Sequence, residues 1–514
     1  MDETIKLALE TIKLAKQAII FVSSRASAEK TAEDIAKYSP LLTIHLEKEV
    51  LDVASTPTKQ CRRLSHTVKK GIAFHHAGLL AKQKEIIEDN FRSGHIKIIC
   101  ATPTLAAGLS MPAYRVIIKS LKRYSGSWGM DWIPVLEYLQ MAGRAGRPEY
   151  EKVGQAIIIA KDEVEKDEIY ERYICGVPEE IYSKLAVEPV LRTYLLALIA
   201  SGVIRDQKSM LDFFSKTFWA FQFKDMDKLH KTMLKMLDLL QGWQFITQTK
   251  PMLPNSASPP DFMSASLYGK QEQQENNLRA TPLGKKVSQL YLDPLTARHL
   301  LDCLAKFDDS KNTFSLLQAI CHTLEMRPLL QVKSKEHDII QEELNKRYGQ
   351  LLEHEPNIYD PEYPEFIASV KTALFFEEWI TEKDEDFLLE KYDIRPGEIY
   401  VKLETADWLI YSSTELALLV NAHIAAKELA KLRVRVEYGV KEELLTLLKL
   451  RGIGRIRARK LHTHGIKNIG NVRAASIQTL AGILGPKLAN DVKTQLGQEL
   501  VSTQKQVEEY SPPK

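Results

Sequence analysis

The sequence predicts a multi-domain protein in which one parallel α/β domain precedes several mostly helical domains. The 514 residues suffice for about three to four domains of ordinary size. Up to about residue 174, short apolar runs rich in β-branched residues alternate with amphipathic helices. That alternation is typical of a parallel sheet with both faces covered. From about residue 177 onward, long helical periodicities replace most of the strands.

The composition is that of an ordinary globular protein. Apolar residues make up 44% of the chain and charged residues 27%, and the net charge is only +3. Any affinity for nucleic acid must therefore come from local clusters of basic residues. No apolar run approaches the roughly 18 residues of a membrane span, and the chain does not open on a secretory signal, so no membrane partner is expected. Five scattered cysteines without a C-x-x-C pair indicate a reducing cytoplasm and no structural zinc.

The α/β domain is expected to occupy residues 1–174. Five apolar runs predict its strands, at residues 18–22, 72–74, 96–100, 116–118 and 156–159. Helices are expected between these strands at residues 26–38 and 79–91, and Gly94 marks the end of the second helix.

Residues 175–292 have the outline of a winged helix. Two long helices and two strands are expected there, at residues 181–201, 226–241, 242–247 and 277–280. The intervening 250–276, rich in Pro, Ser and Gln, predicts an extended wing tip. An all-helical domain is then expected over residues 293–438. It begins at Asp293, a capping residue followed by a proline at the first helical position.

The most specific stretch of the chain is the run Gln-Met-Ala-Gly-Arg-Ala-Gly-Arg-Pro at residues 140–148. Arg144 and Arg147 each follow a glycine. Glycines let the backbone approach a ligand, and guanidinium groups bind phosphate oxygens through two parallel hydrogen bonds. The pattern predicts an arginine finger, which contributes about 10³–10⁵ in rate to phosphoryl transfer. A surface loop held by salt bridges is the alternative interpretation.

Polar residues follow three of the expected strands. They are Ser23 and Arg25, then His75 and His76, then Thr102. Because the carboxyl ends of parallel strands meet the amino ends of helices at one edge, we expect phosphate contacts there that ignore base sequence. Adjacent histidines point to opposite sides of a strand and no motif places a third ligand, so no metal site is predicted.

The last domain, expected over residues 439–503 with a tail at 504–514, contains a basic Gly-x-Gly turn. Residues 449–467 hold seven basic side chains and no acidic one. Such a turn offers backbone N–H groups to a phosphate at the start of a helix, which predicts binding to the DNA backbone. The predicted contacts are Arg451, Gly452, Gly454, Arg455, Arg457, Arg459 and Lys460. A solvated run of charge is the alternative.

In order and spacing, these segments resemble motifs IV, IVa, V and VI of superfamily two helicases. The similarity is to the Ski-two-like archaeal DNA repair helicases and their eukaryotic relatives; it covers nearly the whole chain and is most specific over residues 71–148. It implies that a second RecA-like domain is followed by a winged helix, a helical ratchet domain and a helix-hairpin-helix domain. It also implies ATP-driven 3′→5′ translocation on single-stranded DNA, the unwinding of forks in repair, and association with the nucleoid.

The resemblance also assigns roles to individual residues. By motif position, Arg147 resembles the arginine finger, with Arg144 and Gln140 beside it at the nucleotide. Thr102 resembles the motif V threonine that contacts a DNA phosphate. The remaining residues toward the nucleotide are Gly108, Ser110 and Gly143. The family usually carries asparagine at the position of Ser110, which implies a shorter contact there.

Three aromatic residues are candidates for stacking on bases. Tyr124 and Trp128 lie in a predicted hairpin that splits the duplex in the resembled family, and packing onto their own domain is the alternative. Trp408 corresponds to a tryptophan of the family's ratchet helix, and a place in the core is its alternative. Where the family has an arginine seven residues earlier, this chain has Val401, with Lys402 rotated by about 100°.

Two motifs of the resembled family do not occur in these residues. They are the G-x-x-x-x-G-K-[ST] loop and the Asp-Glu run that serves Mg²⁺, which the family keeps in a first RecA-like domain. We therefore expect ATP and Mg²⁺ as cofactors, with the Mg²⁺ ligands on a partner chain that carries the P-loop. The isolated chain should then bind single-stranded or forked DNA without hydrolysing ATP. The alternatives are a motorless DNA-binding or regulatory module, a truncated helicase, and an RNA-directed relative.

Overall fold

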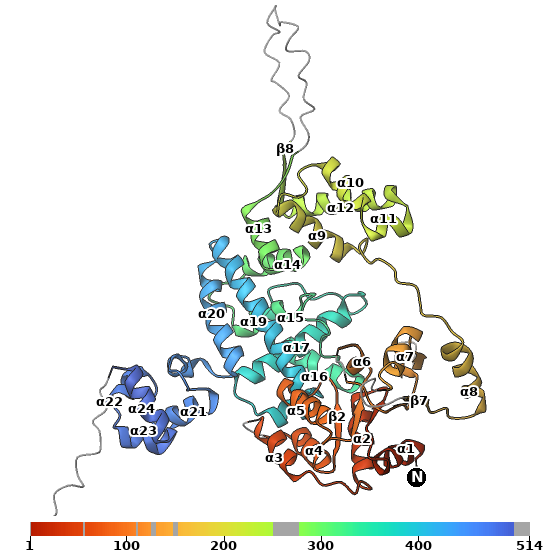
Figure 1. Cartoon of the computed structure of the whole chain (residues 1–514). Coiled ribbons are helices and arrows are strands. Elements are labelled where there is room, and N and C mark those ends of the chain that lie inside the picture. Colours follow the sequence, from red (N-terminus) through yellow and green to blue (C-terminus); the bar gives the residue numbers. More distant parts are fainter. Residues whose placement is uncertain are drawn as a thin grey trace, which may run out of the picture. The chain divides into compact units, whose positions relative to one another are not determined.

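The computed structural model describes residues 2–54, 57–108, 111–124, 130–146, 153–249 and 277–497 (Figure 1). The chain forms two compact units. Unit 1 comprises Met1–Ile181 and Glu385–Lys402, and unit 2 comprises Tyr182–Asp384 and Leu403–Lys514. Among the described helices, none combines the length and apolar character required to cross a lipid bilayer.

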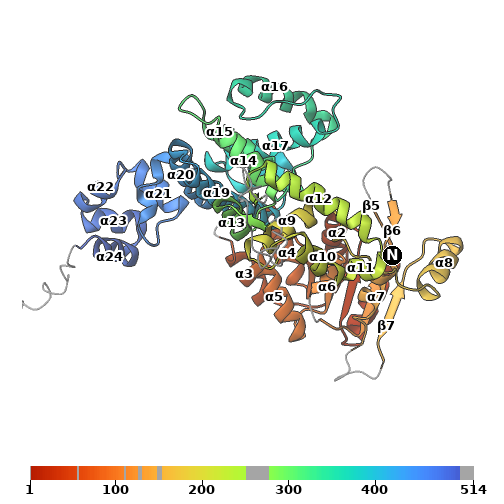
Figure 2. The same cartoon turned by 90° about the horizontal axis from the view of Figure 1, so that it is seen from above.

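A five-stranded parallel sheet in the order β2-β3-β1-β4-β7 forms the centre of unit 1. Its strands are β1 (Ala18–Phe21), β2 (Ile72–His75), β3 (Ile98–Ala101), β4 (Arg115–Ile118) and β7 (Gln155–Ile158). Every residue of the first four strands is buried, because helices cover both faces of the sheet (Figure 2). Strands buried on both faces have continuous apolar sequences, which is the pattern that predicted them. All five predicted strands are confirmed.

Helices connect the strands of unit 1. They are α1 (Glu3–Lys13), α2 (Arg25–Ala36), α3 (Ile44–Asp52), α4 (Lys59–Val68), α5 (Ala81–Arg92), α6 (Thr104–Gly108), α7 (Val135–Ala142), α8 (Glu163–Ile169) and the π-helical turn η2 (Tyr170–Ile174). Ser24 caps α2 by accepting a hydrogen bond from the backbone N–H of Ser27. An antiparallel pair, β5 (Lys122–Tyr124) and β6 (Met130–Trp132), confirms the predicted hairpin between the motif V and motif VI segments.

Residues 385–402, which were expected within the helical domain, group with unit 1. They form α18 (Glu385–Tyr392) and the first turns of α19 (Pro396–Leu419). The backbone N–H of Gly397 donates to the carbonyl of Gly78 at 3.0 Å. A Cβ at position 397 would lie 2.5 Å from two carbonyl oxygens of the 77–79 segment, so only glycine permits this approach.

In residues 182–249 and 277–289, the first part of unit 2 contains four helices, a two-stranded ribbon and a fifth helix. They are α9 (Glu188–Ala200), α10 (Gln207–Ser215), α11 (Phe218–Phe223), α12 (Met226–Gly242), β8 (Ile246–Thr249), β9 (Asn277–Ala280) and α13 (Pro282–Gln289). The helix expected from residue 181 begins at Glu188 instead, because Pro189 favours the first turn and holds the preceding chain extended. The predicted wing tip, 250–276, lies outside the described residues.

The middle of unit 2 is helical. It contains α14 (Pro294–Leu304), α15 (Thr313–Cys321), η3 (Ser334–Glu336), α16 (His337–Arg347), η4 (Tyr348–Gln350), α17 (Tyr363–Ile380), the remainder of α19, and α20 (His423–Tyr438). The Asp293 side chain caps α14, as predicted, by accepting from the N–H of Leu295 at 2.8 Å. Most residues of α17 are buried because it packs against α15, α16 and α20, which makes it the central helix of this region.

The last part of unit 2 has a small core of its own, which includes Leu444, Leu461 and Val492. Its elements are η5 (Glu442–Leu444), η6 (Leu447–Lys449), α21 (Arg455–Thr463), α22 (Ile469–Ala474), α23 (Ile477–Leu484) and α24 (Pro486–Gln495). Gly439 ends α20 in the left-handed conformation, at φ +64°, and separates this part from the preceding helix.

Candidate functional site

The Gly-Arg run leaves α7 and joins the edge of the unit 1 sheet. Ala113, just before β4, forms a parallel bridge with Ala145. The N–H of Gly146 donates to the carbonyl of Ala113 at 2.7 Å. Gly146 has φ +97°, and a Cβ on Gly154 would lie 2.3 Å from the Gly146 nitrogen. Glycine is therefore required at both positions.

Arg144 connects this run to α6, the short helix that follows Thr102. Its guanidinium donates to the carbonyl of Ala106 in α6 through Nε, at 3.1 Å, and through Nη2. The side chain is half-buried and satisfies a carbonyl at the end of a short helix. In this structure, Arg144 therefore holds α6 to the residues that follow α7, and its place beside the nucleotide stays a prediction.

The other residues expected at the nucleotide are described to different extents. Gln140 is exposed on the last turn of α7, where its amide is open to a ligand. Gly143 caps α7, and its N–H donates to Leu139. Gly108 is the last residue of α6. Two predicted residues of this group, Ser110 and Arg147, lie outside the described residues.

The hydroxyls expected to contact DNA lie at the ends of neighbouring strands. Ser23 follows β1 and is exposed, and Thr102 follows β3 and is half-buried. Because β1 and β3 are paired and parallel, both residues lie at the same edge of the sheet. The Thr102 hydroxyl lies 2.9 Å from that of Thr104. Arg25, beside Ser23, forms an ion pair with Glu398 of the 385–402 segment.

The structure corrects the expectation for His75 and His76, whose residues are only 6% and 1% exposed. As adjacent strand-end residues, they point to opposite sides. His75 Nε2 lies 3.0 Å from Glu88 on α5, and burial lowers the pKa of this imidazole although Glu88 raises it. His76 accepts from the N–H of Gly78 and lies 3.2 Å from Glu29 on α2. Neither ring offers surface to DNA, and their role here is in the core.

Sequence reasoning missed the cluster around Glu29. Its carboxylate is 2% exposed and accepts hydrogen bonds from Gln60 at 2.8 Å, from Arg395 at 2.7 Å and from Arg63. Burial alone would raise the pKa of Glu29, but these donors and His76 lower it to about 2. The cluster ties α2, α4 and the 385–402 segment together within unit 1. A single glutamate in an amphipathic helix belongs to no sequence motif, so its burial and its partners could not be predicted from the sequence.

Two of the three aromatic candidates remain without a described side chain. Trp128 lies outside the described residues, and Tyr124 is described only as the last residue of β5. Trp408, on α19, is half-buried, and its indole Nε1 donates to the carbonyl of Leu290 at 3.0 Å. The hydrogen bond orients the ring and leaves part of its surface accessible.

The basic turn before α21 divides into two groups of side chains. Arg451, Arg457 and Lys460 are exposed. Gly452 has φ +82°, and Gly454 precedes α21 without a side-chain cap, which leaves the first N–H groups of the helix available. An open pocket lined by Tyr438 and residues 448–454 lies at this turn.

The second group, Arg455 and Arg459, is engaged within unit 2. Arg459 donates to Glu382 at 2.7 Å and pairs with Glu443 at 2.7 Å; hydrogen bonding to Glu382 raises its pKa. Arg455 donates to the carbonyl of Lys383 at 2.6 Å and lies over the ring of Trp379. The prediction that both contact DNA stays a prediction, and each guanidinium would have to leave these intramolecular partners to reach a phosphate.

Two family models match the chain. The model of the helicase conserved C-terminal domain matches residues 2–149, and the model of archaeal helicase domain 4 matches residues 314–439. The parallel sheet, the Gly-Arg run and these matches define the class of the protein, a helicase.

Curated relatives refine this assignment. The chain is 36% identical to the ATP-dependent DNA helicase Hel308 of Methanocella arvoryzae over 522 residues, which cover 99% of this chain and 66% of the relative. It is 36% identical to the protein of that name from Pyrococcus horikoshii, with 97% and 67% covered, and 34% identical to that of Methanococcus vannielii, with 96% and 68% covered. The chain belongs to the family of Hel308-like archaeal Ski-two-like DNA helicases, and it spans about two thirds of the length of these relatives.

Proposed function

We propose that these residues form the arginine-finger side and the DNA-gripping domains of an ATP-dependent 3′→5′ DNA helicase. Its substrates are single-stranded and forked DNA in replication-fork repair at the nucleoid. The observation that carries the proposal is the junction of the Gly-Arg run with the motif V segment, through the contacts of Arg144 with Ala106 and of Gly146 with Ala113. This junction couples the segment that precedes Arg147 to the strand end that carries Thr102, which is the coupling that a motor needs between nucleotide and DNA.

The domain assignments belong to the same proposal. Residues 1–174 act as the second RecA-like domain, and residues 175–292 as a winged helix, which the ribbon β8–β9 after α12 supports. Residues 293–438 act as the ratchet domain with Trp408 on the DNA. Residues 439–503 act as a helix-hairpin-helix domain that grips a phosphate backbone, supported by the exposed Arg451, Arg457 and Lys460 beside uncapped N–H groups.

These 514 residues contain neither the P-loop nor the Asp-Glu run that serves Mg²⁺. The proposal assigns both to a first RecA-like domain outside these residues, carried by a partner chain. ATP supplies the free energy of translocation when it is bound between the two motor domains. The exposed amide of Gln140 fits a nucleotide at this edge, whereas Arg144 serves to hold α6.

The test is ATP hydrolysis with and without a first motor domain taken from an archaeal relative. The pure chain should bind forked DNA and hydrolyse no ATP, and the reconstituted pair should show DNA-stimulated hydrolysis. Arg147→Ala should lower that activity by about 10³-fold or more while DNA affinity is unchanged. Arg92→Ala is the control, because Arg92 is an exposed arginine at the end of α5 that pairs with Asp89.

Three outcomes would contradict parts of this proposal. DNA-stimulated hydrolysis by the pure chain would overturn the split motor. DNA binding without any activity after reconstitution would favour a motorless module. Tighter binding to RNA forks than to matched DNA forks would favour an RNA-directed relative.

A further inference from the structure

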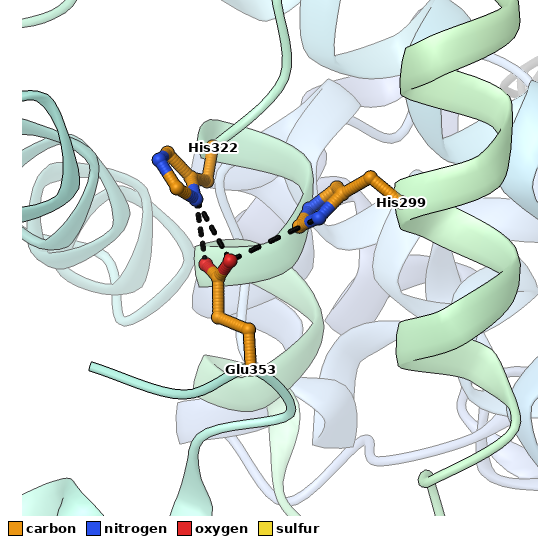
Figure 3. A group of neighbouring side chains, drawn as sticks. All are labelled: His299, His322 and Glu353. Atoms are coloured by element: carbon orange, nitrogen blue, oxygen red, sulfur yellow. Dashed lines mark hydrogen bonds and ion pairs between the residues drawn. The ribbon is translucent and has the colours of Figure 1, made fainter. Parts of the chain in front are cut away.

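A second group of histidines lies in the helical part of unit 2, away from every motif discussed above. His299 is on α14, His322 directly follows α15, and Glu353 lies in the segment between η4 and α17. Figure 3 shows both imidazole rings directed at the Glu353 carboxylate. The Nδ1 of His322 lies 2.8 and 2.9 Å from its two oxygens, and the Nδ1 of His299 lies 3.8 Å from Oε2. All three side chains are largely buried, at 16–21% exposure.

The hydrogen bonds around the group leave a lone pair on His299 directed at a carboxylate. The Nε2 of His299 lies 2.9 Å from the carbonyl oxygen of Ala319. Because a carbonyl oxygen only accepts, Nε2 carries a proton, so in the neutral form of the ring Nδ1 is an acceptor. In that form, Nδ1 faces another acceptor, Glu353 Oε2. A cation between the two atoms would satisfy both.

The surroundings resemble the outer shell of a metal site. Histidines that bind metals almost always donate their second ring N–H to a carbonyl or carboxylate, as His299 does to Ala319. Glu353 also accepts a hydrogen bond from the side-chain amide of Gln318, which would orient a ligating carboxylate. Gln318 is fully buried, and its Oε1 lacks a hydrogen-bond partner among the described residues.

The spacing fits a small transition-metal ion. Tetrahedral zinc, with bonds of about 2.0–2.1 Å, places its ligand atoms about 3.3 Å apart. The present separations of 2.8 and 3.8 Å lie on either side of that value, and all ligand atoms lie within 4.8 Å of one another. Two imidazoles and one carboxylate suit zinc better than the all-oxygen sites of Mg²⁺ or Ca²⁺.

We propose that His299, His322 and Glu353 bind one divalent transition-metal ion of the zinc type. The ion links α14, the end of α15 and the chain that leads into α17, and so stabilises the centre of unit 2. Cys303 is not a member of the site, because its Sγ lies 3.9 Å from Nε2 of His299, the nitrogen that bonds Ala319. A water molecule completes the coordination. The sequence predicted no metal, because these three residues lie in separate segments without a spacing motif.

The experiment uses the full chain stripped of metal with a chelator and then titrated with Co²⁺. We expect one equivalent to give visible ligand-field absorption, to be displaced by Zn²⁺, and to raise the melting temperature. Glu353→Gln keeps an acceptor for His322 and should preserve the metal-free melting temperature. Its affinity for Co²⁺ should fall by more than the roughly 10–100-fold that loss of an outer-shell partner causes.

Two further variants complete the test. His354→Gln is the matched control, because His354 is the exposed neighbour of Glu353 and lies 2.6 Å from the carbonyl of Glu355; it should bind Co²⁺ as the wild type does. Cys303→Ser should also leave the absorption spectrum unchanged. The proposal is overturned if the wild type binds no stoichiometric ion, if Glu353→Gln binds it equally well, or if Cys303→Ser removes the spectrum.

Discussion

Glu29 of unit 1 and Glu353 of unit 2 are both buried glutamates with a histidine beside them, yet their surroundings differ. Two arginines and an amide reach Glu29, so its charge is compensated within the protein. Glu353 has two imidazoles and the amide of Gln318, and no arginine or lysine pairs with it among the described residues. A buried carboxylate supplied with arginines is a structural tie, whereas one faced by two imidazoles and by no arginine or lysine among the described residues has the chemistry of a ligand.

The largest effect is expected from removing the charge of Glu29. Glu29→Gln leaves Arg63 and Arg395 without their shared carboxylate, and breaking a buried ion pair from one side costs on the order of 3 kcal/mol. Urea unfolding should show the loss of stability, and amide hydrogen exchange should locate it in unit 1. Glu33→Gln is the control, because Glu33 also pairs with Arg63 but is 30% exposed, and its loss should cost less than about 1 kcal/mol. If the two substitutions lowered the free energy of unfolding equally, Glu29 would not be the more important partner of Arg63.

Acid should destabilise unit 1 through the same residue. The pKa of Glu29 falls from 4.5 to about 2 on folding, so its contribution to stability is complete above about pH 4.5. That contribution is lost as the pH falls from about 4.5 toward 2, because the unfolded chain takes up the proton first. Melting temperatures measured between pH 6 and pH 3 should fall more steeply for the wild type than for Glu29→Gln. Parallel curves would contradict the assignment.

A smaller effect is expected at the basic turn, where one arginine is tied by carboxylates and its neighbour is not. Arg459→Ala loses the pairs with Glu382 and Glu443, and because these groups are partly exposed we expect only about 1 kcal/mol of destabilisation. Arg457→Ala should instead leave the melting temperature unchanged and weaken DNA binding. In a salt titration, the slope of log affinity against log salt should fall by about one only for Arg457→Ala. If Arg457→Ala lowered the stability and Arg459→Ala weakened DNA binding, the roles given to these two arginines would be reversed.

The local sequence pattern was sufficient to predict the main strands and the helix starts of the fold. Strands β1 to β4 of the unit 1 sheet are buried on both faces, and most of their residues are therefore apolar. The Asp293-Pro294 cap is a signal contained in two residues. Turn glycines between two extended arms of the sequence predict the hairpin β5–β6. Pro189 could also have been used to predict the start of α9, because a proline is favoured in the first turn of a helix and therefore places that start after residue 181.

Side-chain partnerships distant in sequence could not be predicted in this way. Arg395 reaches Glu29 across 366 positions, and Arg459 reaches Glu382 across 77. When only the adjacent residues in the sequence are considered, each guanidinium is expected to be free to bind a phosphate. His75 and His76 were misplaced for the same reason, since the helices that cover their rings come from elsewhere in the domain. The His299, His322 and Glu353 group joins three segments without any spacing motif.

The contact between Gly146 and Gly154 leaves no room for a side chain between Gly146 and the chain that enters β7. A Cβ on Gly154 would lie 2.3 Å from the nitrogen of Gly146, whose N–H donates to the carbonyl of Ala113 beside β4. Gly154→Ala should therefore disturb the Gly146–Ala113 bond and, with it, the point at which the Gly-Arg run meets the sheet.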